Sequence, residues 1–357
     1  MEPVVNNAID SRNSEHKPNA QTFLLRMVLQ AMAAKTVNAA AELGIADLLA
    51  DGPLTSYELA DKSGTHHQSL HRLLLALAGL GVLTCVDNET FTLAELGRPL
   101  RSDVTDSVLG LVRTMTGPEV WRSWGEMVPS VRSGKPGWDL AYQMNWLDYY
   151  SRDPEPSTIF NLAMAEQSRD AAPGIIAAAG LSRFRTVVDI GGGDGTLIAQ
   201  ILQAEQQISG IVFDRSTGLC TATTRLEAAG VADRCQIVTG DFFDSIPAGA
   251  DAYLLKQILH DWNDKLCLAI LRNVRAAIPS HGRLLILERT LPDQIIPGDG
   301  AGIQSLLLDL HMLVVTGGCE RTEGDFGVLL QTSGFELVEM SPPIPPFDYR
   351  VLEARPV

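Results

Sequence analysis

A glycine-rich stretch at residues 187–197, VVDIGGGDGTL, constrains the fold of this chain more than any other feature. The β-branched run that ends at Ile190 predicts a buried strand, four glycines fall within the next five residues, and helical periodicity resumes at Thr196. Strand, glycine turn and helix in this order bring the backbone close to a nucleotide-like ligand, because glycines lack a Cβ and tolerate positive φ. An ordinary tight strand-to-helix turn is the alternative interpretation.

Polar and aromatic residues follow the next three predicted strands. Asp214 ends the second strand and suits a ribose diol, whereas Asp241 and Phe242 follow the third strand and suit the edge and face of an adenine. The fourth strand runs into His260. Because open α/β sheets bind ligands at the carboxyl ends of their strands, we expect these side chains to share one site.

Five blocks in sequence order, DIGGGDGTL, GDFF, LKQILHDWND, LLILERTLPD and TGGCERTEGDF, resemble the S-adenosylmethionine-dependent O-methyltransferases. The resemblance is to the group of plant caffeate O-methyltransferases, acetylserotonin methyltransferase and bacterial small-molecule O-methyltransferases, and it covers nearly the whole chain. It implies an α/β fold with a seven-stranded Rossmann-like methyltransferase sheet. It also implies an N-terminal all-helical, winged-helix-like dimerisation domain.

Length and charge limit the classes of function. A chain of 357 residues exceeds the usual size of one domain, so we expect more than one. The net charge of −15 argues against a general nucleic-acid binder and against an anionic membrane surface as partner. Five cysteines without metal-ligand spacing are typical of reduced thiols, and no signal or transmembrane pattern is present, so we expect a cytoplasmic protein.

Composition and resemblance together divide the chain into four parts. We expect a flexible polar tail at residues 1–19, the dimerisation domain at 20–103, a helical linker and acceptor-pocket segment at 104–180, and the S-adenosylmethionine-binding catalytic domain at 181–357.

An apolar helix is predicted directly after the tail, because large apolar residues recur at a spacing of three to four from Phe23 to Met32. Such a face needs a cover. The resemblance implies a homodimer made largely by helices of this kind, and packing within the same domain is the alternative.

A winged-helix pattern follows this helix. Thr55 and Glu58 predict a capping box, and a second helix and a turn-rich hairpin come after it. A DNA-binding regulator is therefore the hypothesis from another class. The would-be recognition helix at 65–80 carries one Arg and no Lys, which argues against phosphate and base contacts. Its histidines have no cysteine or carboxylate nearby in sequence to complete a metal site.

The segment at 104–180 is predicted to be helical and is rich in Trp and Tyr. Flat apolar walls suit a flat aromatic substrate, although any single ring can simply belong to a core. The block at 160–164 also resembles the family. The resemblance implies that Phe160 and Met164 face the methyl donor.

Methyl transfer from a sulfonium requires an aligned acceptor oxygen, a dry site and removal of the hydroxyl proton. A phenol has a pKa of ~10 and a free imidazole ~6.5, a mismatch of about 3.5 units or about 5 kcal/mol. A nearby carboxylate raises the imidazole pKa and orients the ring. The resemblance implies that His260 is the general base and that Glu288 and Glu320 brace it, whereas each could instead serve in a cap or salt bridge. Asp261 is predicted to cap the next helix, with Asp264 as the competing cap.

The resemblance also implies a set of residues that bind S-adenosyl-L-methionine. After Asp214 the family usually has Leu-Pro, whereas this chain has Arg-Ser, which weakens only the assignment of the following helix. No spaced set of carboxylates predicts a metal ion. The resemblance implies that the methionine part is contacted by Asp189, Gly191, Gly193 and Gly195. It implies that Asp214 binds the ribose, that Asp241 and Phe242 bind the adenine, and that Lys256 contacts the cofactor.

The leading hypothesis is an O-methyltransferase that acts on a hydroxyl of an aromatic or polyketide-like small molecule. The alternative is a donor-binding homologue that does non-methylating chemistry, such as hydroxylation or a pericyclic step. The intact set of His260, Glu288 and Glu320 favours methyl transfer. The sequence leaves oxygen or nitrogen open as the acceptor, because a histidine base can serve either.

Overall fold

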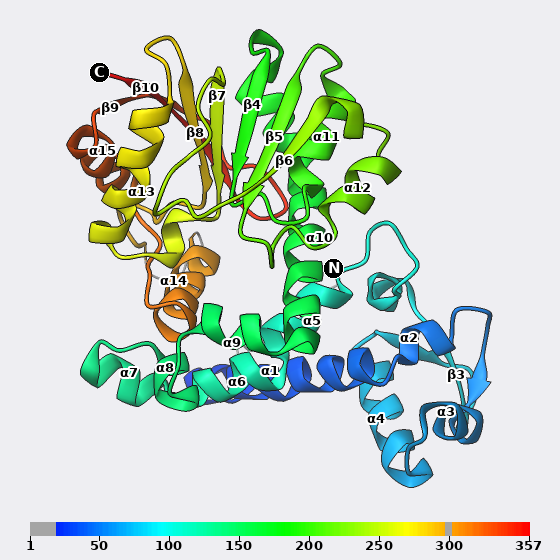
Figure 1. Ribbon diagram of the computed structural model, residues 1–357. Coiled ribbons are helices and arrows are strands. Elements are labelled where there is room, and N and C mark those ends of the chain that lie inside the picture. Colours follow the sequence, from blue (N-terminus) through cyan, green and yellow to red (C-terminus); the bar gives the residue numbers. More distant parts are fainter. Residues whose placement is uncertain (1–18, 297–301) are drawn as a thin grey trace, which may run out of the picture. The chain divides into compact units, whose positions relative to one another are not determined.

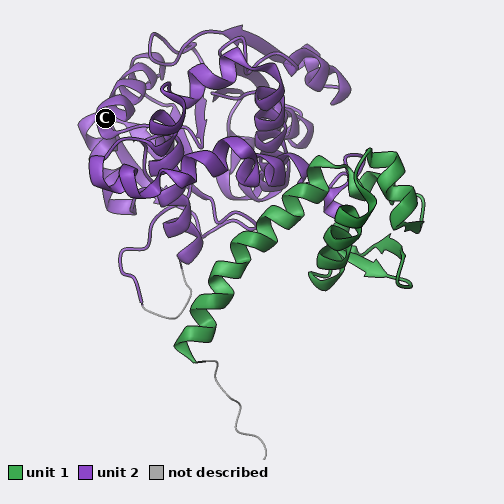
Figure 2. Cartoon of the chain, turned by 90° about the horizontal axis from the view of Figure 1, so that it is seen from below, with its two compact units in different colours: residues 1–97 green, residues 98–357 purple. Residues whose placement is uncertain are grey.

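The computed structural model describes residues 19–296 and 302–357, which fall into two compact units divided after Gly97 (Figure 2). The tail predicted at 1–19 lies, except for Asn19, outside the described residues. Within the described ranges, no helix has both the length and the apolar character needed to cross a membrane.

The N-terminal unit is helical apart from one small antiparallel sheet in the order β1-β3-β2, which includes a two-residue strand that the sequence did not predict. The capping box of Thr55 and Glu58 is formed as predicted. Glu89 Oε2 of the hairpin lies 3.7 Å from His67 Nε2 and 3.6 Å from His71 Nδ1. The sequence did not predict a carboxylate beside these histidines. The elements are α1 (Ala20–Glu42), α2 (Ile45–Leu48), β1 (Leu54–Thr55), α3 (Ser56–Ser63), α4 (His67–Gly79), β2 (Leu83–Cys85), β3 (Thr90–Leu93) and a 3₁₀ helix η1 (Glu95–Leu100) that runs past the division.

The second unit begins with a helical segment, as the sequence predicts. Trp138 is fully buried at the centre of an apolar cluster that several other aromatic residues of the segment join. Glu166 of the longest helix accepts hydrogen bonds from the backbone N–H groups of Gly110 and Leu111 at 2.9 and 2.8 Å, and so joins the two ends of the segment. The helices are α5 (Leu109–Thr116), α6 (Pro118–Gly125), α7 (Met127–Ser133), α8 (Gly137–Tyr142), α9 (Trp146–Arg152) and α10 (Pro154–Ala179).

A seven-stranded sheet forms the centre of the second unit, in the order β6-β5-β4-β7-β8-β10-β9 (Figure 1). The five strands from β6 to β8 are parallel, and β10 pairs antiparallel with both β8 and β9, which confirms the predicted sheet and its final hairpin. The strands are β4 (Thr186–Ile190), β5 (Ser209–Asp214), β6 (Cys235–Thr239), β7 (Ala252–Lys256), β8 (Arg283–Glu288), β9 (Phe335–Met340) and β10 (Arg350–Pro356).

Helices cover both faces of the sheet, and alternate residues of each strand enter opposite cores. Val187 packs with α10, α11 and α12, whereas its neighbour Val188 packs with α13 and α15. Both side chains are fully buried, as expected for central parallel strands. The remaining elements are η2 (Leu181–Arg183), α11 (Thr196–Ala204), α12 (Ala222–Ala228), η3 (Ala232–Arg234), η4 (Leu259–Asp261), α13 (Asp264–Ala277), α14 (Ile303–Val315) and α15 (Glu323–Thr332).

Candidate active site

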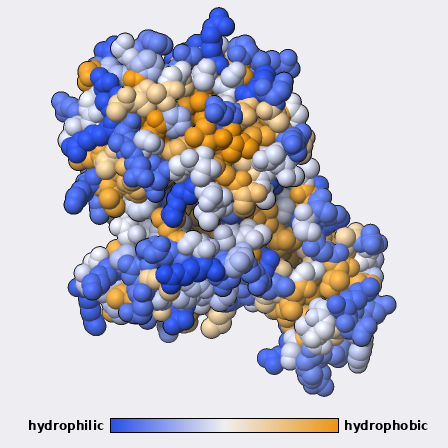
Figure 3. Space-filling view, viewed as in Figure 1, coloured by the Kyte–Doolittle hydropathy of each residue, from blue (hydrophilic) through white to orange (hydrophobic). Residues whose placement is uncertain are grey.

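A cavity of about 430 Å³ lies within the second unit, at the carboxyl ends of the parallel strands. Its walls come from the glycine turn after β4, the ends of β5 and β7, the residues after β6, and helices α5, α9, α10 and α14. The space-filling view shows the surface hollowed below the sheet, with hydrophilic residues over much of the visible face (Figure 3). This is the edge at which the sequence places its polar strand ends.

The glycine turn approaches the cavity closely because it lacks side chains. Gly191 has φ of +68°, and a Cβ on it would meet Ile258 Cδ1 at 2.4 Å. Gly193 has φ of +56° and donates its N–H to Asp214 Oδ2 at 2.8 Å. Gly195 also has positive φ but does not line the cavity, since it is the N-cap residue of α11.

Two side chains of opposite charge lie beside the turn, Asp189 buried and Lys256 half-buried. Asp189 and Lys256 both line the cavity. Burial raises the pKa of Asp189 to about 7 and lowers the pKa of Lys256 to about 8. Lys256 Nζ donates to Gln257 Oε1 at 3.2 Å, and Asp189 Oδ2 is buried without a hydrogen-bond partner among the described residues. An orphaned carboxylate oxygen at this position can accept a hydrogen bond from a bound ligand.

The other residues assigned to the donor also reach the cavity. Asp214 lines it, and burial raises the pKa of this carboxyl above its usual value. Asp241 Oδ1 accepts from the backbone N–H of Phe243 at 2.8 Å, which orients the carboxylate at the end of β6. Phe242 lies beside it, and Phe160 and Met164 line the wall formed by α10.

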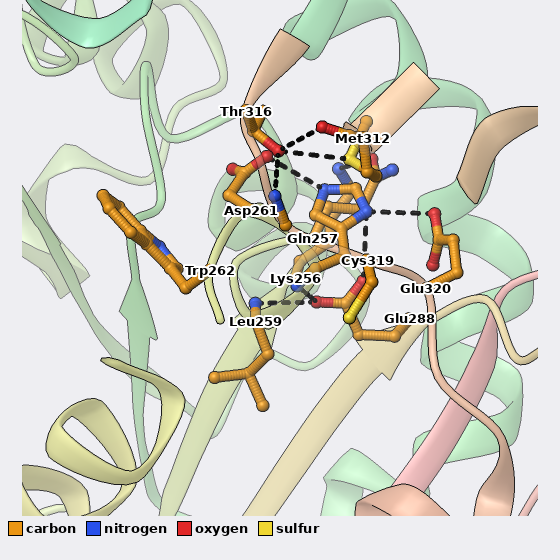
Figure 4. Close-up of polar contacts among 12 residues, drawn as sticks. Lys256, Gln257, Leu259, Asp261, Trp262, Glu288, Met312, Thr316, Cys319 and Glu320 are labelled. Carbon is orange, nitrogen blue, oxygen red and sulfur yellow. Dashed lines mark hydrogen bonds and ion pairs between the residues drawn. The ribbon is translucent and has the colours of Figure 1, made fainter. Parts of the chain in front are cut away.

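His260 stands on η4, directly after β7, and is 7% exposed. Its Nδ1 lies 3.1 Å from Glu320 Oε1 and 3.7 Å from Glu288 Oε2. Glu288 also accepts the backbone N–H of Leu259 at 2.9 Å, which ties the acid to the segment that carries the histidine. Figure 4 shows Glu288 and Glu320 on one side of this cluster and Asp261 on the other.

This cluster shifts the pKa values of its members in a consistent direction. Burial by itself lowers the pKa of His260, but the surrounding carboxylates, led by Glu288, outweigh it and raise the pKa to about 9. Burial raises the pKa of Glu288 to about 7. The Glu320 contact engages Nδ1, so a neutral imidazole donates Nδ1–H to the acid and leaves the lone pair of Nε2 available as a base.

Asp261 does not cap the following helix, and the prediction that it does is wrong. Asn263 is the N-cap residue of α13 and accepts from the N–H of Leu266 at 3.1 Å, so the competing prediction of Asp264 is also wrong. Asp261 Oδ1 instead lies 3.7 Å from His260 Nε2, and burial raises the pKa of Asp261 to about 6. Asp261 is the last residue of η4, so it belongs to the turn before α13 and not to the helix start at Asn263.

Two residues of the loop before α15 hold η4 in place. The buried guanidinium of Arg321 donates to the carbonyl oxygens of Leu259 at 2.9 Å and Trp262 at 2.8 Å. Gly318 packs so closely that a Cβ would meet the carbonyl oxygen of His260 at 1.9 Å. The same loop carries Glu320, so the histidine and its acid are positioned by one contact surface.

The side chains of His260, Glu288 and Glu320 also meet the geometric requirement for a metal site, because one ligand atom from each lies within 4.8 Å of the others. Two contacts are those of a hydrogen-bonded ion-pair cluster. The Nδ1–Glu320 contact is a hydrogen bond, and Glu288 Oε1 accepts a backbone N–H. That this site binds no metal ion stays a prediction from the sequence.

Sequence reasoning missed several cavity residues, because they come from elements whose mutual placement no local pattern reveals. Asp261 and Trp262 were visible next to His260, and their adjacency was the available signal. His311 and Met312 of α14 carried no signal beyond an apolar helix. Tyr150 belongs to the aromatic segment that the sequence did identify as a pocket wall.

The sheet order, the glycine turn and the cavity at the strand ends define a Rossmann-like methyltransferase fold. A family model described as the O-methyltransferase domain matches residues 124–336, and one described as the O-methyltransferase dimerisation domain matches residues 25–103. The chain belongs to this O-methyltransferase family and is an S-adenosylmethionine-dependent methyltransferase.

Similar proteins and solved structures are methyltransferases as well. The phenazine O-methyltransferase of Lysobacter antibioticus is 38% identical, with 94% of this chain and 96% of the relative covered. The 8-amino-8-demethylriboflavin N,N-dimethyltransferase of Streptomyces davaonensis is 34% identical over 85% of this chain and 87% of the relative. An O-methyltransferase from neocarzinostatin biosynthesis, solved with S-adenosylmethionine and 2-hydroxy-5-methyl naphthoic acid, is 32% identical with a TM-score of 0.77, covering 91% and 96% of the two chains.

Proposed function

We propose that this enzyme transfers the methyl group of S-adenosylmethionine to a hydroxyl of an aromatic or polyketide-like small molecule, with His260 as the general base. The observation that carries the proposal is the buried imidazole, whose Nδ1 lies 3.1 Å from Glu320 while the side chain lines the cavity. Glu288 and Glu320 orient the ring and stabilise its protonated form.

The raised pKa makes His260 a suitable base for a phenol. A phenol has a pKa of ~10, so an imidazole with a pKa of about 9 removes its proton against a difference of roughly one unit. That difference corresponds to about 1.4 kcal/mol, compared with about 5 kcal/mol for a free imidazole. The carboxylates thus lower the cost of the proton transfer itself, whereas below a pH of about 9 His260 must first lose its own proton.

The glycine turn and its acids are proposed to hold the donor. S-adenosylmethionine supplies a methyl group already activated by a positively charged sulfur. The backbone at Gly191 and Gly193 admits the donor closely, and the unpaired Oδ2 of Asp189 fits an ammonium or another hydrogen-bond donor of the methionine part. Asp214 is proposed to hold the ribose, and Asp241 with Phe242 the adenine. The half-buried Lys256 is proposed to contact the donor from the end of β7.

An aromatic acceptor is supported by the aromatic residues that α9 and α10 contribute to the cavity wall. The rings of Tyr150 and Phe160 stack at 4.8 Å with an interplanar angle of 21°, and Trp146 packs on Phe160 at 5.7 Å. Flat rings of this kind bind flat substrates by stacking. Met164 lines the same wall and offers a polarisable sulfur to the donor region. The relative from neocarzinostatin biosynthesis binds a naphthoic acid, which agrees with this class.

Labelled methyl transfer tests the proposal directly. Purified protein with methyl-labelled donor and a panel of phenols is expected to incorporate label, and His260→Ala is expected to lose about 10²- to 10⁴-fold in kcat. His281→Ala is the matched control, because the His281 side chain is 73% exposed and lies outside the cavity. Absence of label in the wild type would favour the non-methylating alternative. Equal activity of the His260 variant would remove the base from the mechanism.

An aromatic amine is the second candidate acceptor, because one similar enzyme is an N,N-dimethyltransferase. A neutral amine becomes acidic only once the methyl group is attached, so an amine needs the base less than a phenol does. Amines and phenols of the same ring skeleton in the panel distinguish the two. We assign the hydroxyl because a base of pKa about 9 is matched to a phenol.

We also propose that the chain forms a homodimer through α1, with a dimerisation domain at 20–103, an acceptor-pocket segment at 104–180 and a catalytic domain at 181–357. The match to the dimerisation-domain model at 25–103 supports the first part of this division. The large apolar residues of the first half of α1 are exposed, with Leu24 and Met32 each at 63%.

A further inference from the structure

A second buried histidine, His311 of α14, lines the cavity that contains His260. Its only side-chain hydrogen bond within residues 19–296 and 302–357 is to Trp124 of α6, whose indole Nε1 lies 3.2 Å from His311 Nδ1. The two rings are nearly parallel, with an interplanar angle of 26°. His311 is 8% exposed, so the contact is shielded from bulk solvent.

This contact determines which nitrogen of His311 carries the proton. An indole N–H can only donate a hydrogen bond, so Nδ1 must accept it and must be unprotonated. The neutral ring therefore has its proton on Nε2. Burial, with the positive charges of His260 and Arg289, lowers the pKa of His311 to about 4, which keeps the ring neutral at physiological pH.

The two histidines of the cavity are thus prepared for opposite tasks. Carboxylates face Nδ1 of His260, so that ring can take up a proton through Nε2. A donor-only indole faces Nδ1 of His311, so that ring presents an N–H as a hydrogen-bond donor. Among the described residues, no protein acceptor meets Nε2 of His311.

We propose that His311 is a specificity-determining residue whose Nε2–H donates a hydrogen bond to a carbonyl oxygen of the acceptor, so that the substrate is a hydroxylated aromatic that also carries a carbonyl group. This inference rests on the proposed function. An acceptor without such an oxygen leaves a buried N–H unpaired, and a site built to hydrogen-bond a substrate group disfavours analogues that lack it.

The test uses pairs of acceptors that differ only in a ring carbonyl, such as a hydroxytetralone and the corresponding tetrahydronaphthol, with pairs of one to three rings. The measured quantity is the ratio of kcat/KM with and without the carbonyl. The wild type is expected to prefer the carbonyl compound by about tenfold or more. His311→Phe is expected to abolish this preference, mainly through KM, and His311→Gln to restore part of it through its amide N–H.

Met312→Leu is the matched control, because it changes a neighbouring cavity residue of the same helix without a polar group. It is expected to leave the ratio within about twofold of the wild type. Trp124→Phe is expected to lower the ratio, because the loss of the indole N–H frees the ring to move its proton to Nδ1.

A second measurement does not depend on turnover. In protein labelled with ¹⁵N-histidine, the His311 signals, identified by their absence in His311→Gln, are expected to show an unprotonated Nδ1 and a protonated Nε2 at neutral pH. A protonated Nδ1, or a ratio that His311→Phe leaves unchanged, overturns this inference while the proposed function stands. Failure of the wild type to methylate any compound overturns the proposed function itself.

Discussion

At the scale of single residues, the proposed chemistry of this enzyme depends on how neighbours set the protonation of two buried imidazoles. His260 faces carboxylates and has a pKa of about 9, whereas His311 faces an indole N–H and has a pKa of about 4. Both rings are buried to a similar degree. The difference therefore comes from the charge and hydrogen-bonding capacity of the partners, since desolvation acts on both rings in the same direction.

The proposed base predicts a particular pH dependence. His260 must lose its proton before it can act, so kcat/KM is expected to rise about tenfold per pH unit toward a plateau near the pKa of about 9. Glu320→Gln removes a negative charge that stabilises the imidazolium. The His260 pKa then falls, so the rising limb moves to lower pH and the plateau drops.

The measurement is the pH profile of kcat/KM for both proteins, with Glu323→Gln as control. Glu323 is exposed on the first turn of α15, three residues from Glu320, and its replacement is expected to leave the profile unchanged. If the Glu320→Gln profile coincided with that of the wild type, Glu320 would not influence the pKa of the base.

At the scale of elements, the site depends on the contact between η4 and the loop that leads into α15. The loop presents its backbone at Gly318 directly against the carbonyl oxygen of His260, a fit that only a residue without a Cβ permits. Arg321 then bonds two carbonyl oxygens around η4 and the carboxylate of Asp264 at 2.8 Å. Gly318 and Arg321 do not line the cavity, and we propose that they position the histidine.

Arg321→Lys is expected to disturb this arrangement despite the conserved charge. A lysine ammonium cannot reproduce the planar fork that reaches two carbonyls and a carboxylate together, so buried acceptors lose their partners. We expect a loss of about 2–4 kcal/mol in the free energy of unfolding and at least a tenfold lower kcat. Urea unfolding and steady-state kinetics measure both, with the exposed Arg272→Lys of α13 as control.

A stable and fully active Arg321→Lys protein would show that η4 is held by its other contacts. A stable protein with reduced kcat and an unchanged KM for the donor would identify Arg321 as a positioning residue. A reduced kcat with an unchanged KM in a stable protein distinguishes a displaced base from general unfolding.

At the scale of the whole molecule, one unit holds the cavity, and the other holds helix α1, whose large apolar side chains are exposed among the described residues. Phe23 and Val28 of α1 are 57% and 61% exposed, and they belong to a run of exposed large apolar residues from Phe23 to Met32. An exposed apolar surface of this extent marks an interaction site. The match to the dimerisation-domain model points to a second copy of the chain as the cover.

Analytical ultracentrifugation tests this proposal. The wild type is expected to sediment as a dimer, and the double variant Leu24→Glu with Met32→Glu as a monomer, because two charges would have to be buried at each helix. Val86→Glu is the control, since Val86 is 58% exposed but lies on the hairpin outside α1. A wild type that sediments as a monomer would contradict the proposal.

Much of the fold could be predicted because its signals are local. Buried parallel strands are short apolar runs, so β4 and its neighbours were located within a residue or two of their observed bounds. The glycine turn predicted that the backbone approaches a ligand closely. The block resemblance brought together His260, Glu288 and Glu320, which the structure places in one buried cluster.

The sequence by itself thus determined the sheet, the glycine turn and the edge at which the site lies. Only the tertiary structure decided which side chains meet there. It placed Asn263 rather than Asp261 at the start of α13, and it joined Trp124 to His311 across 187 residues. Periodicity reports which face of an element is buried, whereas the partner of a buried polar group depends on how distant helices pack, and no local pattern contains that information.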